Sequence, residues 1–181
     1  MALKIDDSIV DAHKKSGIYN SNMQHWKEAE NEFSEVLKLD PTLISLKKLR
    51  GVARYYLKDY EGSIDDFTEY LKIDSTDDET YISRATAYEA LGRDIEATKD
   101  MSKAAESKIR LTGYNTLNYP DFISLINVLL EAGDTTKALH HLNIFTSKNQ
   151  SVAAHVITVK ILLSRGDWEE TYKEVVKGLE T

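Results

Sequence analysis

The sequence matches itself when it is shifted by 34 residues, as from position 17 to position 51. This shift moves Gly17 onto Gly51 and Phe33 onto Phe67, and a second shift moves Phe67 onto Met101. Small residues fall on small ones and large apolar residues on large ones, as packing requires where a small residue on one helix admits a bulky side chain from its neighbour. A fixed period of roughly 20 to 50 residues is typical of repeat arrays. The chain is therefore predicted to be a stack of similar units.

Each period contains the pattern of two helices. Residues 43–56 are one helical run of the second unit, and the apolar stripe on the following helix comprises Ile64, Phe67, Tyr70 and Leu71. A helix end favours a residue that tolerates positive φ. Glycines stand at the turns of the later units: Gly92, Gly133 and Gly166. No strand-like alternation competes with these patterns, so the predicted fold class is all-α.

The segment 26–41 (WKEAENEFSEVLKLDP) carries Trp26, Ala29, Phe33 and Pro41 in the pattern of sizes that marks the tetratricopeptide repeat (TPR). On these residues and the period, the chain resembles the TPR family. The resemblance covers the chain from about Asp11 to Gly178. It implies a right-handed superhelical array of about five antiparallel helix pairs, a TPR-like α-solenoid.

We expect a single TPR-like domain over residues 1–181. Its approximate units are 10–41, 42–75, 76–109, 119–150 and 151–181, with an insertion near 110–118. The insertion is indicated by the spacing from Ala97 to Ala138, which is 41 residues and exceeds the period by seven. Either the second helix of the third unit is longer than the others, or a surface loop projects there.

The composition argues against several classes of function. With 30 Asp and Glu against 23 Lys and Arg, the net charge is −7, whereas nucleic-acid binding needs clustered cations that replace counterions. A chain without cysteine has no thiolate nucleophile and no Cys-ligated metal. His140 and His141 are adjacent, about 100° apart on a helix, and cannot form an i, i+4 metal pair. We therefore expect no enzyme, no catalytic residue, no cofactor, no metal and no nucleic-acid partner.

The longest apolar stretch, residues 125–130, is far shorter than the roughly 20 residues that cross a bilayer. Residues 1–7 turn acidic at once, unlike a signal peptide. We therefore expect no membrane insertion and a cytoplasmic location.

In the TPR family, the first helix of each unit lines a concave groove that binds a peptide or helix of another protein. The resemblance implies that ligand contacts come from side chains on these helices that face away from the second helix. Carried onto this chain, they are Lys14, Ile18 and Ser21 in the first unit, Lys48, Leu49, Val52 and Tyr55 in the second, Glu79, Ser83, Thr86 and Glu89 in the third, and Ser124 and Asn127 in the fourth.

The best-known groove of the family grips the acidic C-terminal tail of heat-shock chaperones with convergent lysine, arginine and asparagine side chains. Lys14 matches this carboxylate clamp. The other matching places hold Ile18, Leu49, Glu79 and Ser83, so one cation of three remains and a carboxylate faces the ligand. Binding of an acidic chaperone tail is therefore not expected.

The apolar groove positions lie between Lys14 and Lys48. Our hypothesis is a groove that takes an amphipathic or partly apolar segment, with these lysines attracting an acidic flank. The predicted function is a protein-interaction module that acts as a scaffold or co-chaperone adaptor. The alternative is a substrate-holding chaperone or secretion-chaperone domain, as part of a longer multidomain protein.

The orientation of the second unit's first helix is open. Lys47 and Arg54 occupy places where the family usually has large, half-buried side chains. Either their stems extend to solvent, or Arg54 meets a carboxylate such as Asp65 or Asp66, or the helix is rotated. In the rotated case three side chains enter the core: Leu49, Val52 and Tyr56.

The last unit also leaves alternatives. Its apolar positions are Trp168, Tyr172, Val175, Val176 and Leu179. Repeat arrays normally end on a helix with a polar outer face. Either the chain is part of a longer protein, or this unit self-associates, or its charged residues already form the polar face.

Overall fold

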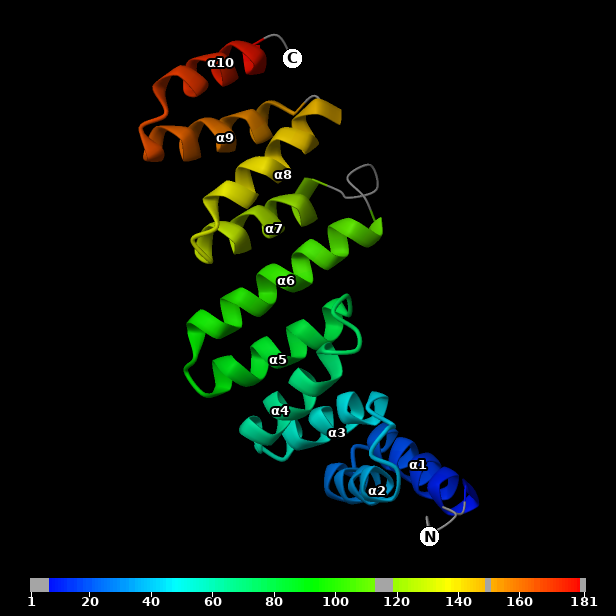
Figure 1. Cartoon of the computed structure of the whole chain (residues 1–181). Coiled ribbons are helices and arrows are strands. Elements are labelled where there is room, and N and C mark those ends of the chain that lie inside the picture. The colour runs from blue at the N-terminus through cyan, green and yellow to red at the C-terminus, as the bar shows by residue number, and fades with distance from the viewer. Residues whose placement is uncertain (1–6, 113–118, 149–150, 180–181) are drawn as a thin grey trace. The chain divides into compact units, whose positions relative to one another are not determined.

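The computed structural model describes residues 7–112, 119–148 and 151–179. Those residues form ten α-helices and no strand, which confirms the all-α prediction (Figure 1). The helices are α1 (Asp7–Asn22), α2 (Trp26–Leu39), α3 (Ser45–Tyr56), α4 (Tyr60–Leu71), α5 (Asp78–Ala90), α6 (Asp94–Thr112), α7 (Tyr119–Glu131), α8 (Thr135–Lys148), α9 (Val152–Arg165) and α10 (Trp168–Leu179).

The chain packs as two compact units, residues 1–104 (unit 1) and 105–181 (unit 2), and each is described by itself. The single domain expected over residues 1–181 stays a prediction. Helices α1 and α2 together span Asp7–Leu39, so α1 begins before the predicted unit 10–41, and α3 and α4 span Ser45–Leu71, inside the predicted unit 42–75. Helix α6 has 19 residues and reaches Thr112, so it enters the predicted insertion. The remainder of the insertion, 113–118, lies outside the described residues.

Two glycines of unit 1 admit phenylalanine rings from the second helix of their own pair. A Cβ atom on Gly17 would lie 2.6 Å from Phe33 Cε1, and one on Gly51 would lie 2.8 Å from Phe67 Cε1. Both rings are fully buried. The prediction that small residues face large apolar ones at the 34-residue period is confirmed at these two pairs.

Each unit has its own apolar core. In unit 1 the buried cluster joins the inner face of α2 to α3, with residues Ala29, Phe33, Val36, Leu37, Leu46 and Ala53. In unit 2 the buried cluster is centred on Phe122 and Phe145, whose rings stack with centroids 3.9 Å apart. The apolar residues are therefore divided among successive helix interfaces, as repeat arrays require.

The turn inside each helix pair uses one residue with positive φ. Gln24 (φ 60°), Lys58 (φ 65°) and Gly92 (φ 68°) follow one another at the 34-residue period. Gly133 and Gly166 take the same conformation in the later pairs, so the predicted turn role of the three later glycines is confirmed. The first two pairs place a side chain where glycine is favoured.

Replacing Lys58 with glycine is expected to stabilise unit 1 by about 0.5–1 kcal/mol, because a non-glycine residue in the left-handed conformation costs about 1–2 kcal/mol and the entropy of glycine in the unfolded chain offsets part of the gain. Urea unfolding followed by far-UV circular dichroism measures the change. The matched reverse substitution, Gly92→Ala, should destabilise by a similar amount. A Lys58→Gly protein less stable than the wild type would contradict the assignment.

Candidate functional site

Helices α3 and α5, the first helices of the second and third pairs, border a cavity of about 280 Å³ in unit 1. Its lining consists of Val52, Tyr55, Tyr56, Phe67, Ser83 and Thr86. Four of these six residues are among those that the sequence predicts for the groove: Val52, Tyr55, Ser83 and Thr86. We call this cavity the α3–α5 pocket.

The α3–α5 pocket has an aromatic wall. Tyr55 makes an edge contact with Tyr56 and a tilted contact with Tyr60, with ring centroids 5.5 Å apart in each pair. Tyr56 in turn stacks on Trp26 with centroids 4.2 Å apart. Contacts of this kind hold aromatic side chains in place, so the wall can bury a ligand side chain at a small entropic cost.

The opposite wall is polar only at its hydroxyl groups. Ser83 Oγ donates a hydrogen bond to the carbonyl oxygen of Glu79 at 2.8 Å, and Thr86 Oγ1 donates to that of Ile82 at 2.7 Å. Both hydroxyl protons are therefore used within α5, and only acceptor lone pairs remain. The pocket can take an apolar side chain together with one or two hydrogen-bond donors.

Lys48 forms ion pairs with two carboxylates at the start of α5, those of Asp77 and Glu79. Its Nζ lies 2.6 Å from Asp77 Oδ2 and 3.2 Å from Glu79 Oε2, and 5.7 Å from the centroid of the Tyr70 ring. Burial lowers the pKa of Lys48, but the hydrogen bonds and charges of Asp77 and Glu79 outweigh it and raise the pKa above its ordinary value. For Asp77, burial raises the pKa, but the hydrogen bond of Lys48 and the Thr80 N–H bring it below its usual range. Lys48 thus ties α3 to α5, and its charge is largely neutralised.

The other predicted groove residues are dispersed. Lys14 and Ile18 are exposed on α1 and Ser21 is half-buried, while Asn127 is exposed on α7 of unit 2. Glu89 is exposed on α5, one helical turn after Thr86. Of the predicted α3 and α5 residues, Val52, Tyr55, Ser83 and Thr86 line the α3–α5 pocket, and no predicted residue of α1 is part of its lining.

Leu49 packs against the buried core of unit 1. Arg54 contacts Asp66, with Nη1 3.0 Å from Oδ2, which is one of the alternatives that the sequence left open. Val52 lines the pocket and Tyr56 is exposed, so the rotated helix, which would bury both, is not what the structure has. Of the three residues expected inside a rotated helix, only Leu49 behaves as a core residue.

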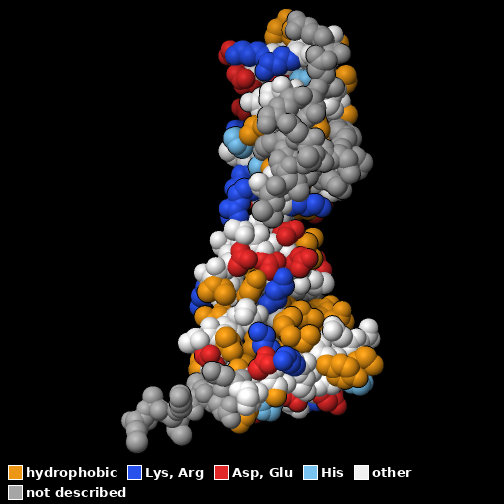
Figure 2. Space-filling view, turned by 90° about the vertical axis from the view of Figure 1, so that its right-hand side faces the viewer, with side chains coloured by type: hydrophobic (Ala, Val, Ile, Leu, Met, Phe, Trp, Pro, Cys, Tyr) orange, Lys and Arg blue, Asp and Glu red, His pale blue; other side chains and the backbone are white. Residues whose placement is uncertain are grey.

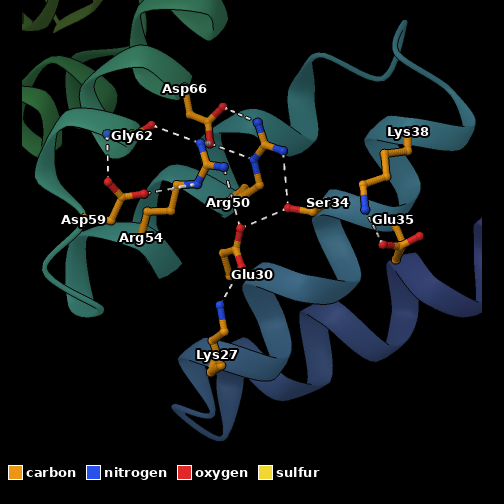
Figure 3. A network of polar contacts seen from close by, with 10 residues as sticks. All are labelled: Lys27, Glu30, Ser34, Glu35, Lys38, Arg50, Arg54, Asp59, Gly62 and Asp66. Atoms are coloured by element: carbon orange, nitrogen blue, oxygen red, sulfur yellow. Dashed lines mark hydrogen bonds and ion pairs between the residues drawn. The ribbon is translucent and has the colours of Figure 1, made fainter.

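A second, larger cavity of about 610 Å³ in unit 1 lies beside α2 and α3, next to the polar network of Figure 3. Arg50 binds Asp66 with both Nε (2.8 Å) and Nη2 (2.6 Å), and its Nη1 donates to Ser34 Oγ at 3.3 Å. Glu30 accepts a hydrogen bond from Ser34 and lies 3.6 Å from Arg54 Nη2. The charges that line this cavity mainly satisfy one another, so they make a weaker ligand site than the α3–α5 pocket.

Two further groups of residues were not among the predicted contacts. Tyr56 and Phe67 complete the pocket, and Tyr56 could have been found from its i, i+4 step after Val52. In unit 2, α9 exposes an apolar stripe of Val152, Val156 and Leu163. The α9 stripe has the spacing of one helix face, so the first helix of the fifth pair also has apolar side chains on an exposed face.

Figure 2 shows hydrophobic side chains at the surface of the N-terminal unit in several patches.

Within the described part of the chain, no three His, Asp or Glu side chains gather closely enough to hold a metal ion. In the same residues, no helix combines the length and the apolar character that a membrane span needs.

No protein-family model and no curated protein matches the sequence. Solved structures match the fold. A structure of MamA aligns with a TM-score of 0.53 and 18% identity over 96% of this chain and 92% of that one. The Arabidopsis OM64 TPR domain aligns with a TM-score of 0.54 and 23% identity over 66% of this chain and 93% of that one. The first TPR of Spaghetti (RPAP3), bound to the HSP90 peptide SRMEEVD, aligns with a TM-score of 0.56 and 19% identity over 73% of this chain and 99% of that one.

Proposed function

From the tetratricopeptide-repeat fold of the chain, we propose that it is a non-catalytic interaction module that binds a peptide or helix of a partner protein as a scaffold or co-chaperone adaptor. The observation that carries the proposal is the α3–α5 pocket, in which predicted groove residues from two successive first helices line one cavity. A cytoplasmic location is part of the same proposal.

The chemistry of the pocket favours an apolar anchor side chain. Aromatic and aliphatic walls dominate the lining, and full burial of one Leu, Phe or Met side chain is worth about 1.5–3 kcal/mol. A single anchor of this kind is the usual centre of a binding hot spot. We therefore infer that the ligand is an amphipathic segment that inserts one bulky apolar residue between α3 and α5.

An acidic C-terminal tail does not fit this surface. Lys48 is held by Asp77 and Glu79, so its charge is not available to a carboxylate ligand. Glu79 itself is exposed next to Lys48 and would repel such a tail. The RPAP3 relative was solved with an acidic HSP90 peptide, and we propose that this chain takes a different class of segment.

The double substitution Val52→Asp/Thr86→Asp tests the proposal. It would place two carboxylates in the pocket, and we expect it to weaken binding at least tenfold, or about 1.4 kcal/mol, because an unpaired charge would be buried against the apolar anchor. Partners captured from the native cell with the wild type are identified first. The segment that binds is then titrated against both proteins by calorimetry.

Thr136→Asp is the control for the threonine change, since it places a carboxylate on an exposed residue of α8 in unit 2. Its affinity should equal that of the wild type. If Val52→Asp/Thr86→Asp keeps its far-UV helical spectrum and binds the segment as tightly as the wild type, the α3–α5 pocket is not the binding site.

A further inference from the structure

The charges at the start of α5, beside the α3–α5 pocket, are unequal. One cation, Lys48, faces two carboxylates there, because its Nζ lies 2.6 Å from Asp77 Oδ2 and 3.2 Å from Glu79 Oε2. The Glu79 side chain is 80% exposed, whereas that of Asp77 is 12% exposed. One negative charge is therefore in excess at this end of α5, and it is carried by a side chain that a ligand can reach.

Glu79 and Glu89 lie on α5 before and after the residues that line the pocket. Ser83 and Thr86 come four and seven residues after Glu79, so helical geometry places these three side chains on one face. Glu89 follows Thr86 by three residues and stands 34 residues after Tyr55, another lining residue. It is exposed, and no cation of the described residues is paired with it. Each carboxylate is thus about one helical turn, roughly 5 Å along the axis, from the nearer lining residue of α5.

The other cations of α3 and α5 are directed elsewhere. Lys47, Arg50 and Arg54 of α3 line the second cavity, beside α2, and are not part of the lining of the α3–α5 pocket. Arg84, the basic residue of α5, binds Asp100 of α6 through Nε and Nη2. The α3–α5 pocket therefore combines apolar walls with exposed carboxylates at both ends of its α5 side.

The walls of the pocket also favour hydrogen-bond donors. The hydroxyl protons of Ser83 and Thr86 are used within α5, and their remaining lone pairs only accept hydrogen bonds. Lysine and arginine side chains carry donors and no acceptor, and tyrosine rings such as those of Tyr55 and Tyr56 attract a cation held over their faces. An aspartate or glutamate of a ligand would meet acceptors and like charge at the same place.

We propose, on the premise of the function proposed above, that the segment bound in the α3–α5 pocket is basic. Its apolar anchor has a lysine or arginine about one helical turn before it and another about one turn after it, opposite Glu79 and Glu89; in a helical ligand these are the positions three or four residues from the anchor. The acidic flank expected from the sequence relied on Lys14 and Lys48. Lys48 is already paired with Asp77 and Glu79, and Lys14 is not part of the lining.

A peptide selection with the full chain as bait tests the proposal. The library displays helical peptides of about 15 residues, with Leu, Phe or Met at the centre and random residues at the positions three and four to either side. We expect the wild type to enrich Lys and Arg at these positions at least about threefold over Asp and Glu. Val52→Gln/Thr86→Gln, which fills the pocket without adding charge, is selected in parallel and should not retain these peptides.

Titration of one enriched peptide then locates its charge contacts. Glu79→Gln/Glu89→Gln should weaken binding about threefold to twentyfold at low salt, as the loss of two exposed ion pairs does, and added salt should reduce this difference. Glu28→Gln/Asp65→Asn is the matched control, because it removes the same net charge from exposed residues of α2 and α4, and it should bind like the wild type. A peptide with glutamine in place of its lysines and arginines should bind the wild type and Glu79→Gln/Glu89→Gln equally, which separates a charge contact from a change in the fold.

The outcomes distinguish this proposal from the function on which it rests. Enrichment of acidic or uncharged flanks overturns the basic ligand but not the pocket, and so does equal binding of the basic peptide to the wild type and Glu79→Gln/Glu89→Gln. If the wild type enriches no peptide, or if Val52→Gln/Thr86→Gln enriches the same ones, the α3–α5 pocket is not the binding site and both proposals are wrong.

Discussion

Replacing Asp66 with alanine is expected to lower the free energy of unfolding by about 3–5 kcal/mol, the range measured when one partner of a buried ion pair is removed. Asp66 is 2% exposed and accepts hydrogen bonds from Arg50 Nε, Arg50 Nη2 and Arg54 Nη1 at 2.6 to 3.0 Å. Without the carboxylate, two half-buried guanidinium groups from α3 would face each other with no anion between them.

The surroundings of Asp66 cannot easily replace it. The hydrogen bonds of Asp66 raise the pKa of Arg50 in the wild type, against the lowering effect of burial. This support is lost in the variant, but a guanidinium stays charged at neutral pH without it. Ser34 is neutral and already donates to Glu30. Two carboxylates remain near Arg54: Glu30, 3.6 Å from Nη2 and also paired with Lys27, and Asp59, 3.6 Å from Nε. Neither is within hydrogen-bond distance of a guanidinium nitrogen. The network in Figure 3 therefore depends on Asp66 for its charge balance.

Urea unfolding of the wild type and Asp66→Ala, followed by circular dichroism at 222 nm, measures this loss. Asp65→Ala is the matched control, because Asp65 is the exposed neighbour on α4, and its effect should be within about 0.5 kcal/mol. An Asp66→Ala protein within about 1 kcal/mol of the wild type would show that the buried pair contributes little beyond its desolvation cost.

The same network recurs one period later and could have been found in the sequence. Arg84 binds Asp100 through Nε and Nη2 at 2.6 and 2.7 Å and donates to Thr68 at 2.9 Å. Each of these residues lies 34 positions after its counterpart in the first network. The 34-residue shift that aligns the apolar residues also aligns this polar set, but a comparison restricted to apolar and small positions does not detect the polar repeat. Repeated polar positions deserve the same comparison as repeated apolar ones.

The predicted groove shows where sequence reasoning stops. Successive helical residues differ by about 100°, so Leu49 and Val52 lie near the boundary between the core and the groove. A small rotation of α3 about its own axis decides which of them is exposed, and the 34-residue spacing does not determine that rotation. The pairing of Lys48 with Asp77 depends on the angle between α3 and α5, which also lies beyond a one-dimensional pattern. By contrast, the turn glycines and the facing small and large residues follow directly from helix geometry.

Replacing Gly51 with valine is expected to destabilise unit 1 by about 2–3 kcal/mol, as overpacking of a dense core does. The new Cβ would lie 2.8 Å from Phe67 Cε1, closer than real Cβ contacts. The Phe67 ring is 1% exposed, so moving it away from the new methyl groups costs it packing contacts elsewhere. The change therefore forces α3 and α4 apart, and valine's own helix propensity, which exceeds that of glycine, cannot offset this.

Phe67→Leu in the same chain should recover much of the loss, because it removes the ring edge that meets the new methyl groups. Alone, Phe67→Leu leaves a cavity and should cost about 1–2 kcal/mol, so the two changes together should cost at least about 1 kcal/mol less than their sum. Ala12→Val, on an exposed position of α1, controls for valine in a helix and should change stability by less than about 0.7 kcal/mol. If the effects of Gly51→Val and Phe67→Leu on the free energy of unfolding simply add in urea unfolding, the cost of valine at position 51 does not come from contact with the Phe67 ring.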